Sequence, residues 1–364
     1  MIQMVDLKRQ YLDIKAEIDD AVRDVLDSAQ FVLGPNVARL EGEVADYHGV
    51  SHAMGVANGT DALLLALQAC GIERGDEVIT TPFTFIATAE VIAQLGAVPV
   101  FVDIDPNSFN MDVRKIEKKI TGKTRALMPV HLFGHPADMD VICELGRKFE
   151  LKIIEDCAQA FGAEYKGQKV GTFGDCGCFS FFPSKNLACY GDGGMVITSD
   201  KGAADRIRML RNHGSKIKYY HTALGYNSRL DEIQAAIVRV KLNKIDMFND
   251  MRRHNAEQYR TGILRDDIAV PVEMPGCRHV YHQFTLKSEV RDTIAEKLRE
   301  NDIASAVYYP VPLHRQDVFN RSDNVSDDLK ISEDCARTVI SLPMFPELTE
   351  AEIKQICEVI NNVS

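Results

Sequence analysis

The sequence predicts an α/β protein with a mostly parallel sheet in a large domain and a smaller C-terminal α+β domain. Apolar strand candidates alternate with helical stretches in the first half of the chain: strands at 78–81, 98–103, 125–130 and 152–154, helices near 112–120 and 139–149. This alternation is typical of parallel strands covered by helices on both faces. The 364 residues, 45% hydrophobic and 26% charged, suffice for such a core and a second unit.

The N-terminal part of the chain predicts two helices before the first strand. Apolar residues recur at helical spacing from 11 to 29, which indicates an amphipathic helix. Gly34 and Pro35 break that helix, and a second helix begins near residue 36. Residues 52–57 then read as a short strand that leads into a helix at about 61–69.

The turn before the helix at 61–69 is a candidate anion site. Asn58, Gly59 and Thr60 precede the helix, and Asp61 begins it. A helix start exposes free backbone N–H groups and the positive end of the helix dipole, which together bind a phosphate. The same four residues also make an ordinary turn and N-cap, and the sequence alone leaves both interpretations open.

A second feature is the strand that ends in two carboxylates. Ile153 and Ile154 lead to Glu155 and Asp156, and Gln159 follows three residues later. A carboxylate at the C-terminal end of a parallel strand points into the crevice where open α/β sheets bind ligands. Asp156 is therefore a candidate ligand-binding residue.

The most distinctive stretch runs over 179–195, FSFFPSKNLACYGDGGM. An apolar run is broken by Pro183, a lone Lys185 follows, and a glycine-dense turn leads into a strand at 195–198. Partial burial among aromatic residues would lower the pKa of this amine and favour a Schiff-base lysine; the alternative is a surface lysine whose stem lies along the rings. A lysine paired with Asp156 is what pyridoxal phosphate needs, because the carboxylate keeps the ring nitrogen protonated.

The second half of the chain changes pattern beyond about residue 252. A helix at 203–211 is followed by a long helical register from 230 to 248 that continues to 264, and then come strand candidates at 281–287, 305–309 and 339–344 and helices near 291–300 and 349–361. We therefore expect a large domain over 1–250, with an N-terminal arm, and a small α+β domain over 251–364.

Composition excludes several classes of function. The formal net charge of −11 gives no footprint for nucleic acid or for an anionic membrane. No leader-like segment or apolar run long enough to span a membrane is present, so we expect a cytoplasmic protein. Nine cysteines, an odd number, fit reduced thiols, and the Cys176 and Cys178 pair lacks the partners of a zinc site, so no metal is expected.

Taken together, the FFPSKN and YGDGG segments and the earlier EDxAQ pattern resemble the DegT/DnrJ/EryC1/StrS family of fold-type I pyridoxal-phosphate sugar aminotransferases, over essentially the whole chain. The resemblance implies that Lys185 carries the cofactor as a Schiff base and that Gln159 hydrogen-bonds the ring hydroxyl. It further implies that Phe85 stacks on the ring, although a core position is the alternative for this residue. Residues matching the family's cofactor site are also Gly59, Thr60, Asp61 and Ser180.

The resemblance also implies a homodimer with shared active sites. The GYNSRLDEIQAA segment matches a family segment that reaches across the dimer interface, so Asn227 would contact the neighbour's cofactor phosphate and Arg229 the neighbour's substrate. Without the resemblance, Asn227 reads as an N-cap and Arg229 as a surface arginine. The YYPVPLH loop adds three substrate-side candidates: Tyr308, Tyr309 and His314.

The reaction implied by the family is ping-pong transamination, in which pyridoxamine phosphate is the intermediate form, L-glutamate the donor and a nucleotide-linked keto sugar the acceptor. FFPSKN with YGDGG matches relatives acting at C-3, which favours a UDP-linked N-acetylated 3-keto hexuronate or a dTDP-linked 3-keto-6-deoxyhexose for surface-glycan (O-antigen) synthesis; C-4 amination is the alternative. Lys185 argues against the dehydratase branch, which has histidine there. A non-catalytic regulator on the same fold is the remaining alternative. Cys157 and Ala188 depart from the usual alanine and glycine.

Overall fold

A seven-stranded sheet organises the molecule. The computed structural model describes residues 1–319 and 329–363. The strand order is β1-β9-β8-β5-β4-β2-β3, and β9 alone runs against the other six. The strands are β1 (His52–Val56), β2 (Glu77–Thr80), β3 (Val98–Phe101), β4 (Thr124–Leu127), β5 (Lys152–Asp156), β8 (Cys176–Ser180) and β9 (Gly194–Thr198). The predicted α/β class with a mostly parallel sheet is confirmed.

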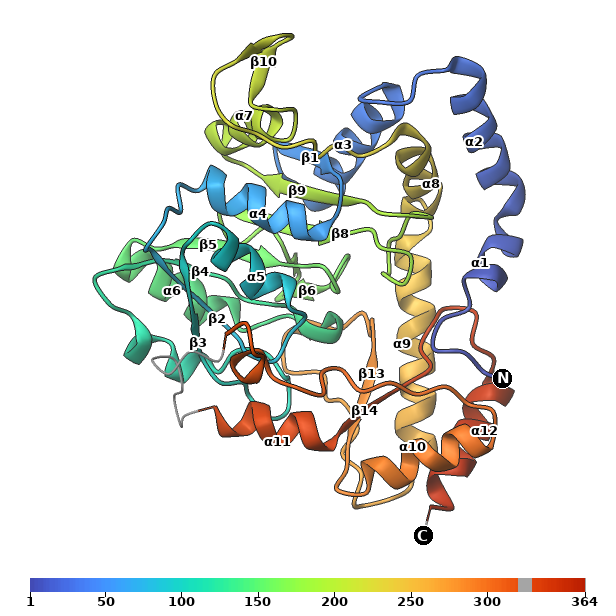
Figure 1. Ribbon diagram of the computed structural model, residues 1–364. Helices are drawn as coiled ribbons and strands as arrows, with labels where there is room; N and C mark the ends of the chain where they lie inside the picture. The colour runs from blue at the N-terminus through green and yellow to red at the C-terminus, as the bar shows by residue number, and fades with distance from the viewer. Residues whose placement is uncertain (320–328, 364) are drawn as a thin grey trace.

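Helices cover both faces of this sheet, as expected for strands that are almost entirely buried (Figure 1). One face packs against α4 (Gly59–Ala69), α5 (Ala87–Gln94) and α7 (Lys201–Leu210). The other packs against α3 (Pro35–His48), α6 (Met139–Phe149) and α8 (Glu232–Leu242). The carboxyl ends of the parallel strands are left facing the C-terminal part of the chain, so a ligand site at that edge is bounded by two parts of the molecule.

The N-terminal arm is two helices rather than the single helix predicted over 11–29. These are α1 (Leu7–Asp13) and α2 (Lys15–Ser28), and the chain turns at Ile14, where the backbone leaves helical geometry. Ile14 and Ile18 are buried against Ile237 of α8, so packing on α8 fixes the arm. Figure 1 shows the arm as a separate blue column beside the body of the protein.

Two consecutive helices link the sheet to the C-terminal part of the chain. The predicted continuous helix from 230 is wrong at one point: α8 ends at Leu242 and α9 (Ile245–Gly262) begins after a short break. The two helices stack nearly end to end, and α9 runs down beside the C-terminal part of the chain (Figure 1). The predicted boundary between 250 and 251 falls inside α9, and the two-domain division itself stays a prediction.

The C-terminal part has its own apolar core around an antiparallel strand pair. It contains β13 (Phe284–Lys287), β14 (Val339–Leu342), α10 (Arg291–Glu300), α11 (Lys330–Thr338) and α12 (Glu350–Asn361). The N-terminus joins it, because Ile2 pairs with Ile303. The predicted strand at 305–309 is reduced to one bridge, between Ala306 and Ser341. Its neighbours are prolines, which cannot donate to a ladder.

Several short elements complete the fold. The helix predicted near 112–120 is instead a pair of 3₁₀ turns, which continue directly into each other without forming an α-helical turn. The remaining short elements are η1 (Val113–Lys115), η2 (Glu117–Lys119), η3 (Leu132–Gly134), η4 (Leu313–Arg315), β6 (Glu164–Tyr165), β7 (Gln168–Lys169), β10 (Ser215–Ile217), β11 (Tyr220–His221) and β12 (Cys277–Arg278). Within the described residues, no helix is both long and apolar enough to cross a membrane.

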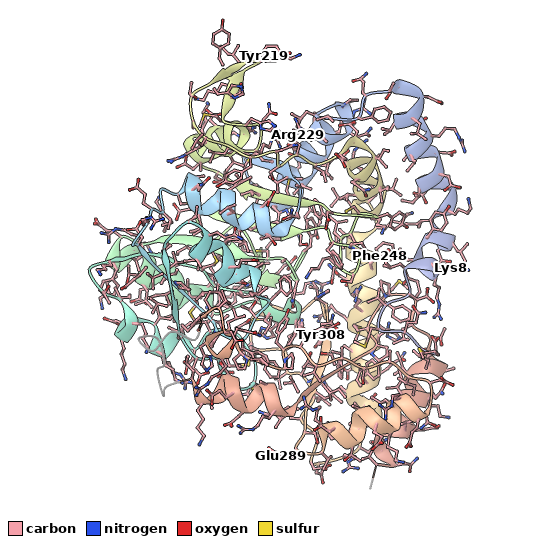
Figure 2. The ribbon with its side chains drawn as sticks, viewed as in Figure 1. Lys8, Tyr219, Arg229, Phe248, Glu289 and Tyr308 are labelled. Carbon is pink, nitrogen blue, oxygen red and sulfur yellow. The ribbon has the colours of Figure 1, made fainter. Side chains whose placement is uncertain are left out.

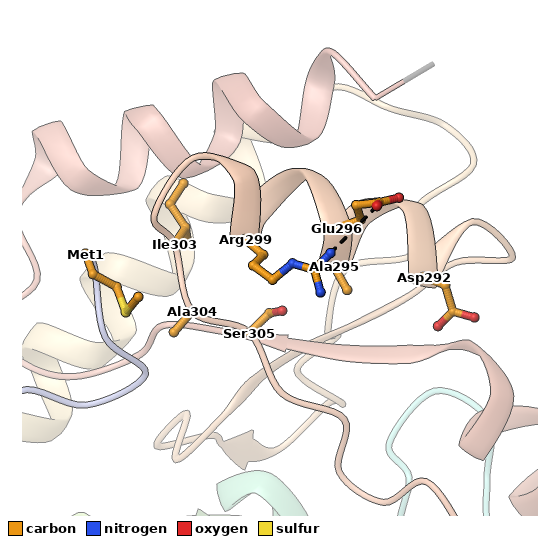
Figure 3. Close-up of a pocket in the computed structure, with 8 residues that line it drawn as sticks. All are labelled: Met1, Asp292, Ala295, Glu296, Arg299, Ile303, Ala304 and Ser305. Atoms are coloured by element: carbon orange, nitrogen blue, oxygen red, sulfur yellow. Dashed lines mark ion pairs between the residues drawn. The ribbon is translucent and has the colours of Figure 1, made fainter.

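A hollow of about 500 Å³ lies on the small C-terminal part, between the N-terminus and α10 (Figure 3). Its walls include Met1, Ile303 and the ion pair of Arg299 with Glu296, whose charged groups are 3.6 Å apart. Both members of that pair are exposed, and none of the sequence-predicted site residues lines the hollow. The chemistry therefore has to be sought elsewhere, at the carboxyl edge of the sheet.

Candidate active site

Lys185 lies on the loop that joins β8 to β9 at the carboxyl edge of the sheet. The legs of the loop are held together, because the Phe181 N–H donates to the carbonyl of Gly193 at 2.8 Å. The Lys185 N–H closes a tight turn on the carbonyl of Phe182, also at 2.8 Å. Burial lowers the pKa of the Lys185 amine to about 8, and the nearby charge of Asp156 opposes that shift. An amine with this pKa is partly neutral near pH 7, as a nucleophile requires.

Asp156 is the last residue of β5 and faces the same edge. It pairs with Cys178 of β8, so Ser180 lies two residues further along the neighbouring strand. Its carboxylate accepts a hydrogen bond from the Thr88 hydroxyl at 2.8 Å and from the Ala158 N–H at 3.1 Å. Burial raises the pKa of Asp156, and these two bonds oppose that rise. A buried carboxylate so oriented can hold a protonated ring nitrogen, as the sequence predicted.

Gln159 joins the two parts of the molecule at the site. Its Oε1 accepts from the Phe133 N–H at 2.7 Å, and its Nε2 donates to the Tyr309 hydroxyl at 3.0 Å. The ring of Phe85 lies 6.4 Å from that of Tyr309, centroid to centroid, and Phe85 is 55% exposed. Phe85 is therefore not a core residue, and its exposed ring is available for stacking on a ligand.

The candidate phosphate cradle is the start of α4. The helix begins at Gly59, and the Asn58 side chain accepts from the Asp61 N–H at 2.8 Å, as an N-cap does. A Cβ added to Gly59 would lie 2.7 Å from the Cβ of Ser180, so glycine is required for this close approach. The first N–H groups of a helix have no acceptor within it. The N–H groups of Gly59 and Thr60 and the hydroxyl of Ser180 thus form one end of the site.

Pyridoxal phosphate fits this set of residues. The start of α4 and Ser180 would hold its phosphate, Asp156 its ring nitrogen, and Lys185 its aldehyde carbon, with Gln159 near the ring hydroxyl. When bound, the ring supplies an electron sink for the substrate carbon. The fit rests on the crowded glycine at the helix start and on a buried carboxylate beside a partly neutral amine.

A metal does not fit the one buried cluster of suitable side chains among the residues that the structure describes. Atoms of His131, Glu155 and Cys157 lie within 4.8 Å of one another. The Glu155 carboxylate, however, already accepts from the backbone N–H groups of Gly171, Phe173 and Gly174, at 2.7 to 2.8 Å, and from His131 at 3.0 Å. Four donors point at the carboxylate, which is the arrangement of a buried anion and not of a cation ligand.

Three residues beside Lys185 and Asp156 escaped the sequence analysis. Thr88 holds Asp156, but it lies in the first turn of α5 and no motif distinguishes it from a core threonine. Asn186 follows Lys185 directly, and its amide contacts His282 from the far part of the chain. Contacts between residues this far apart in sequence leave no local pattern, so only the fold reveals them.

The remaining predicted residues lie further from Lys185. Asn227 is exposed. Arg229 donates to the side chain of Asn212 at 3.3 Å. Both residues lie on the part of the molecule from which the β10–β11 hairpin projects. Figure 2 shows Arg229 well separated from Tyr308 within one chain. His314 is buried and its Nε2 lies 2.9 Å from Glu333 Oε1. The substrate roles of Arg229, Tyr308, Tyr309 and His314 stay predictions.

Comparison with known proteins identifies the family. The model of the DegT/DnrJ/EryC1/StrS aminotransferase family matches residues 12–361. A UDP-N-acetyl-3-dehydro-α-D-glucosamine 3-aminotransferase from Acidithiobacillus ferrooxidans is 49% identical, covering 99% of this chain and 97% of that protein. A Pseudomonas aeruginosa UDP-2-acetamido-2-deoxy-3-oxo-D-glucuronate aminotransferase is 41% identical over the whole length of both. A Geobacillus stearothermophilus protein named pleiotropic regulatory protein is 48% identical, covering 99% and 97%.

A solved structure shows the same fold. Streptomyces venezuelae DesV, in complex with a ketimine intermediate, superposes with a TM-score of 0.96 at 42% identity, covering 99% of this chain and 97% of that one. With a lysine and a carboxylate placed for pyridoxal phosphate, the chain is a pyridoxal-phosphate-dependent aminotransferase. It belongs to the DegT/DnrJ/EryC1/StrS aminotransferase family.

Proposed function

We propose that this aminotransferase transfers the amino group of L-glutamate to C-3 of a nucleotide-linked 3-keto sugar. The observation that carries the proposal is a partly neutral Lys185 amine at the same sheet edge as the buried Asp156 carboxylate, in a chain whose relatives, at 49% and 41% identity, are named for 3-keto UDP-N-acetyl sugars. Of the two sugar classes that the sequence favours, a UDP-linked 2-acetamido-3-keto sugar is therefore the first choice. A dTDP-linked 3-keto-6-deoxyhexose is the second choice. Amination at C-4 of the sugar is the alternative to amination at C-3.

Each site residue has a task in this reaction. Lys185 would hold the cofactor at rest, and its amine, once released, would act as the base and acid that moves a proton at the substrate carbon. Asp156 keeps the ring nitrogen protonated, and Thr88 holds Asp156. Gln159 and Tyr309, which bond each other, would contact the cofactor from the side of the C-terminal part. The start of α4 would hold the phosphate, and Phe85 would stack on the ring.

The first test is the visible absorption spectrum of the purified protein with pyridoxal phosphate, before and after L-glutamate, compared with Lys185→Ala. We expect a band that depends on Lys185 and that glutamate converts to the spectrum of pyridoxamine phosphate. UDP-N-acetyl-3-keto-glucosamine, its uronate and a dTDP-3-keto-6-deoxyhexose are then offered to the aminated form. Mass spectrometry detects the amino sugar, and NMR assigns the aminated carbon. A product aminated at C-4 would overturn the C-3 assignment.

A regulatory role is the second candidate, because the 48% identical Geobacillus relative is named as a regulator. The two candidates are separated by the same spectrum. A wild-type protein with no lysine-dependent band would refute the transaminase proposal for this chain and leave regulation. Reversal of the band by a keto sugar would show that the chain catalyses both half-reactions.

We infer that the active unit is a homodimer in which Arg229 and Asn227 complete the partner's site. Support comes from the apolar residues that the single chain leaves exposed around this segment, since exposed apolar patches mark interfaces. Ile217, Tyr219, Tyr220 and Leu224 are 68% to 97% exposed, on and beside the β10–β11 hairpin (Figure 2). A second copy of the chain would cover these side chains. The same interface would bring Asn227 and Arg229 to the partner's site.

The dimer is tested by complementation. Lys185→Ala and Arg229→Ala are each expected to be inactive, but mixed dimers contain one site with both residues intact. Recovered activity after unfolding and refolding the two variants together supports a shared site, whereas two variants that never complement each other refute it. Arg229→Lys separately tests whether the arginine binds a hexuronate carboxylate, since lysine lacks the bidentate fork. Unchanged activity on the uronate would exclude that role.

We place the reaction in the cytoplasm and its product in surface-glycan synthesis. The nine cysteines support a reducing compartment, because all of them are free thiols in the folded chain. Several are buried in the core of the large domain, where oxidation would disturb packing. Fractionation of cells, with the enzyme followed by its lysine-dependent band, checks the location. Loss of the amino sugar from the surface glycan in a strain lacking this chain checks the pathway.

A further inference from the structure

Two cysteine sulfur atoms meet at the far end of the helix whose start is the candidate phosphate cradle. Cys70 follows α4 directly as its C-cap, and Cys176 is the first residue of β8. Their Sγ atoms are 4.0 Å apart, in a weak thiol–thiol hydrogen bond, although the two residues are 106 positions apart in the sequence. The fold therefore brings together two thiols from distant segments.

This pair differs from the other cysteines of the chain. All nine cysteines lie in the described part of the chain, and among them this is the one pair of sulfur atoms within hydrogen-bond distance. Cys178 belongs to the same C-x-C segment as Cys176 and faces the same apolar core, but its Sγ donates to the carbonyl of Ala62 at 3.5 Å. The C-x-C segment thus provides one thiol with a thiol partner and one with a carbonyl partner.

The two thiols differ in their access to solvent. Cys70 is partly exposed, whereas Cys176 is fully buried. The hydrogen bond with Cys70 and the burial of the side chain both raise the pKa of the Cys176 thiol well above its ordinary value, so this thiol stays protonated. A small oxidant from solvent therefore reaches Cys70 first, and Cys176 lies beside it as the thiol that can react next.

We propose that Cys70 and Cys176 are a peroxide-sensitive thiol pair, which on oxidation forms a disulfide that ties the end of α4 to β8. The bond requires the two sulfur atoms to approach to about 2.05 Å, and rotation of the partly exposed Cys70 side chain supplies a movement of this size. In a reducing compartment such a bond is transient and serves as a sensor of oxidants. The proposal does not depend on which reaction the protein catalyses.

The position of the pair connects it to the cofactor site. The opposite ends of the same two elements meet there, because Gly59 begins α4, Ser180 ends β8, and a Cβ on Gly59 would lie 2.7 Å from that of Ser180. A disulfide between Cys70 and Cys176 would join α4 and β8 a second time, away from the ligand. It adds no atoms to the packed core, unlike oxidation of a single thiol to a sulfinic acid.

The oxidation takes place in two steps with hydrogen peroxide as the oxidant. The Cys70 thiolate attacks one peroxide oxygen, the O–O bond breaks, and the released hydroxide takes a proton to become water, which leaves Cys70 as a sulfenic acid. The Cys176 sulfur then attacks the Cys70 sulfur, the S–S bond forms, and the S–O bond breaks as the second water leaves with the Cys176 proton. In sum, two thiols lose two electrons and two protons, and one peroxide becomes two waters.

The first test treats the folded protein, loaded with pyridoxal phosphate, with an equimolar amount of hydrogen peroxide. Free thiols are then alkylated, and the protein is digested without reduction for mass spectrometry. We expect one cross-linked pair of peptides, carrying Cys70 and Cys176 and lighter by two hydrogen atoms, which a phosphine reductant separates. Cys70→Ser should not form it. The matched control is Cys143→Ser, because Cys143 is also partly exposed but its Sγ contacts the carbonyl of Phe173 at 3.8 Å, and this variant should form the cross-link as wild type does.

A second measurement separates the roles of the two thiols. In Cys176→Ala the sulfenic acid of Cys70 has no thiol to react with, so the trapping reagent dimedone should label Cys70 there and label it little in wild type. Equal labelling in both proteins, or conversion of Cys70 in wild type to a sulfinic acid without a cross-link, overturns the proposal. The absorption band with pyridoxal phosphate, compared with wild type, checks that each variant is folded.

The third measurement tests whether the bond fastens α4 to β8. The oxidised wild type should unfold at a urea concentration about 1 M higher than the reduced protein, because the bond closes a long loop in the unfolded chain. The reductant should abolish this difference, and Cys70→Ser should show none after peroxide. An unchanged midpoint in protein whose Cys70–Cys176 cross-link is confirmed by mass would refute the fastening.

Discussion

Thr88→Val should destabilise the ionised form of Asp156 in the folded protein, and the free-energy cost follows from the hydrogen bond that is lost. The Thr88 hydroxyl donates to Asp156 Oδ2 at 2.8 Å, and both side chains are buried. A hydrogen bond to an ionised group contributes about 1.5–3 kcal/mol. Losing this bond therefore raises the pKa of Asp156 further in the folded protein, because the hydroxyl stabilises the ionised form. Valine has nearly the same shape as threonine, so the hydroxyl is the main group lost.

The sign of the pH dependence follows from the direction of the shift. Burial already raises the pKa of Asp156 in the folded, cofactor-free protein above its unfolded value. Such a group contributes stability below its unfolded pKa, and this contribution is lost as the pH rises through the folded pKa. Thr88→Val raises the folded pKa further. The free-energy deficit of the variant should therefore be small in acid, where Asp156 is protonated in both proteins, and reach about 1.5–3 kcal/mol at higher pH.

Urea unfolding of the cofactor-free protein, at one protein concentration and over about pH 4 to pH 8, measures this deficit. The control is Thr80→Val, another fully buried threonine, whose hydroxyl donates to the neutral carbonyl of Met128 at 2.9 Å. Its deficit should not change with pH. If the deficit of Thr88→Val is also the same at every pH, then Thr88 does not act on the charge of Asp156 and the reasoning is refuted.

Three further predictions concern the phosphate turn and two buried carboxylates. Gly59→Ala should weaken pyridoxal phosphate binding about 10-fold in a spectral titration, because its Cβ would lie 2.7 Å from that of Ser180; Gly42→Ala, with open space around it, should bind normally. Glu155→Gln should lower the free energy of unfolding by about 3 kcal/mol, because its NH2 group would face N–H donors that one of the two carboxylate oxygens now accepts; an unchanged urea midpoint would contradict this. Asp103→Asn should lower stability by about 2 kcal/mol at neutral pH, because Asp103 accepts from the start of α11. Hydrogen bonds lower the pKa of Asp103 against the opposing effect of burial, so this deficit should shrink as the pH falls through the folded pKa, and a constant deficit would argue against it.

The sequence predicted the large features because they repeat locally. The alternation of strands and helices identified the sheet. Helix α6 on the sheet and helix α10 in the C-terminal part begin and end where the periodicity placed them, at Met139–Phe149 and Arg291–Glu300. The predicted strand at 305–309 is wrong for a reason that the pattern of apolar residues does not show. Its apolar residues are followed by prolines and fill space between the two parts of the molecule, so one bridge replaces a ladder.

The sequence predicted the site residues that lie in a local motif. It did not predict the residues that only the fold brings to the site from distant segments. Asp156 ends a strand, Gly59 begins a helix, and Lys185 lies in a distinctive loop between two strands, so a local sequence pattern marks each of them. Thr88 contacts Asp156 from an ordinary helix turn, and His282 contacts Asn186 from the C-terminal part of the chain. These hydrogen bonds join distant segments, which a single sequence does not encode in any local pattern.

The reversed direction of β9 has a consequence for how the protein acquires its cofactor. The lysine loop is a hairpin whose two legs, β8 and β9, are buried neighbours in the middle of the sheet, and its glycine end is pressed against Asn58. Both ends of the loop are thus anchored by folding alone, so the entropy of ordering Lys185 is lost before any ligand arrives. The binding site is pre-organised, and stripping and reloading the cofactor should be reversible without refolding the chain.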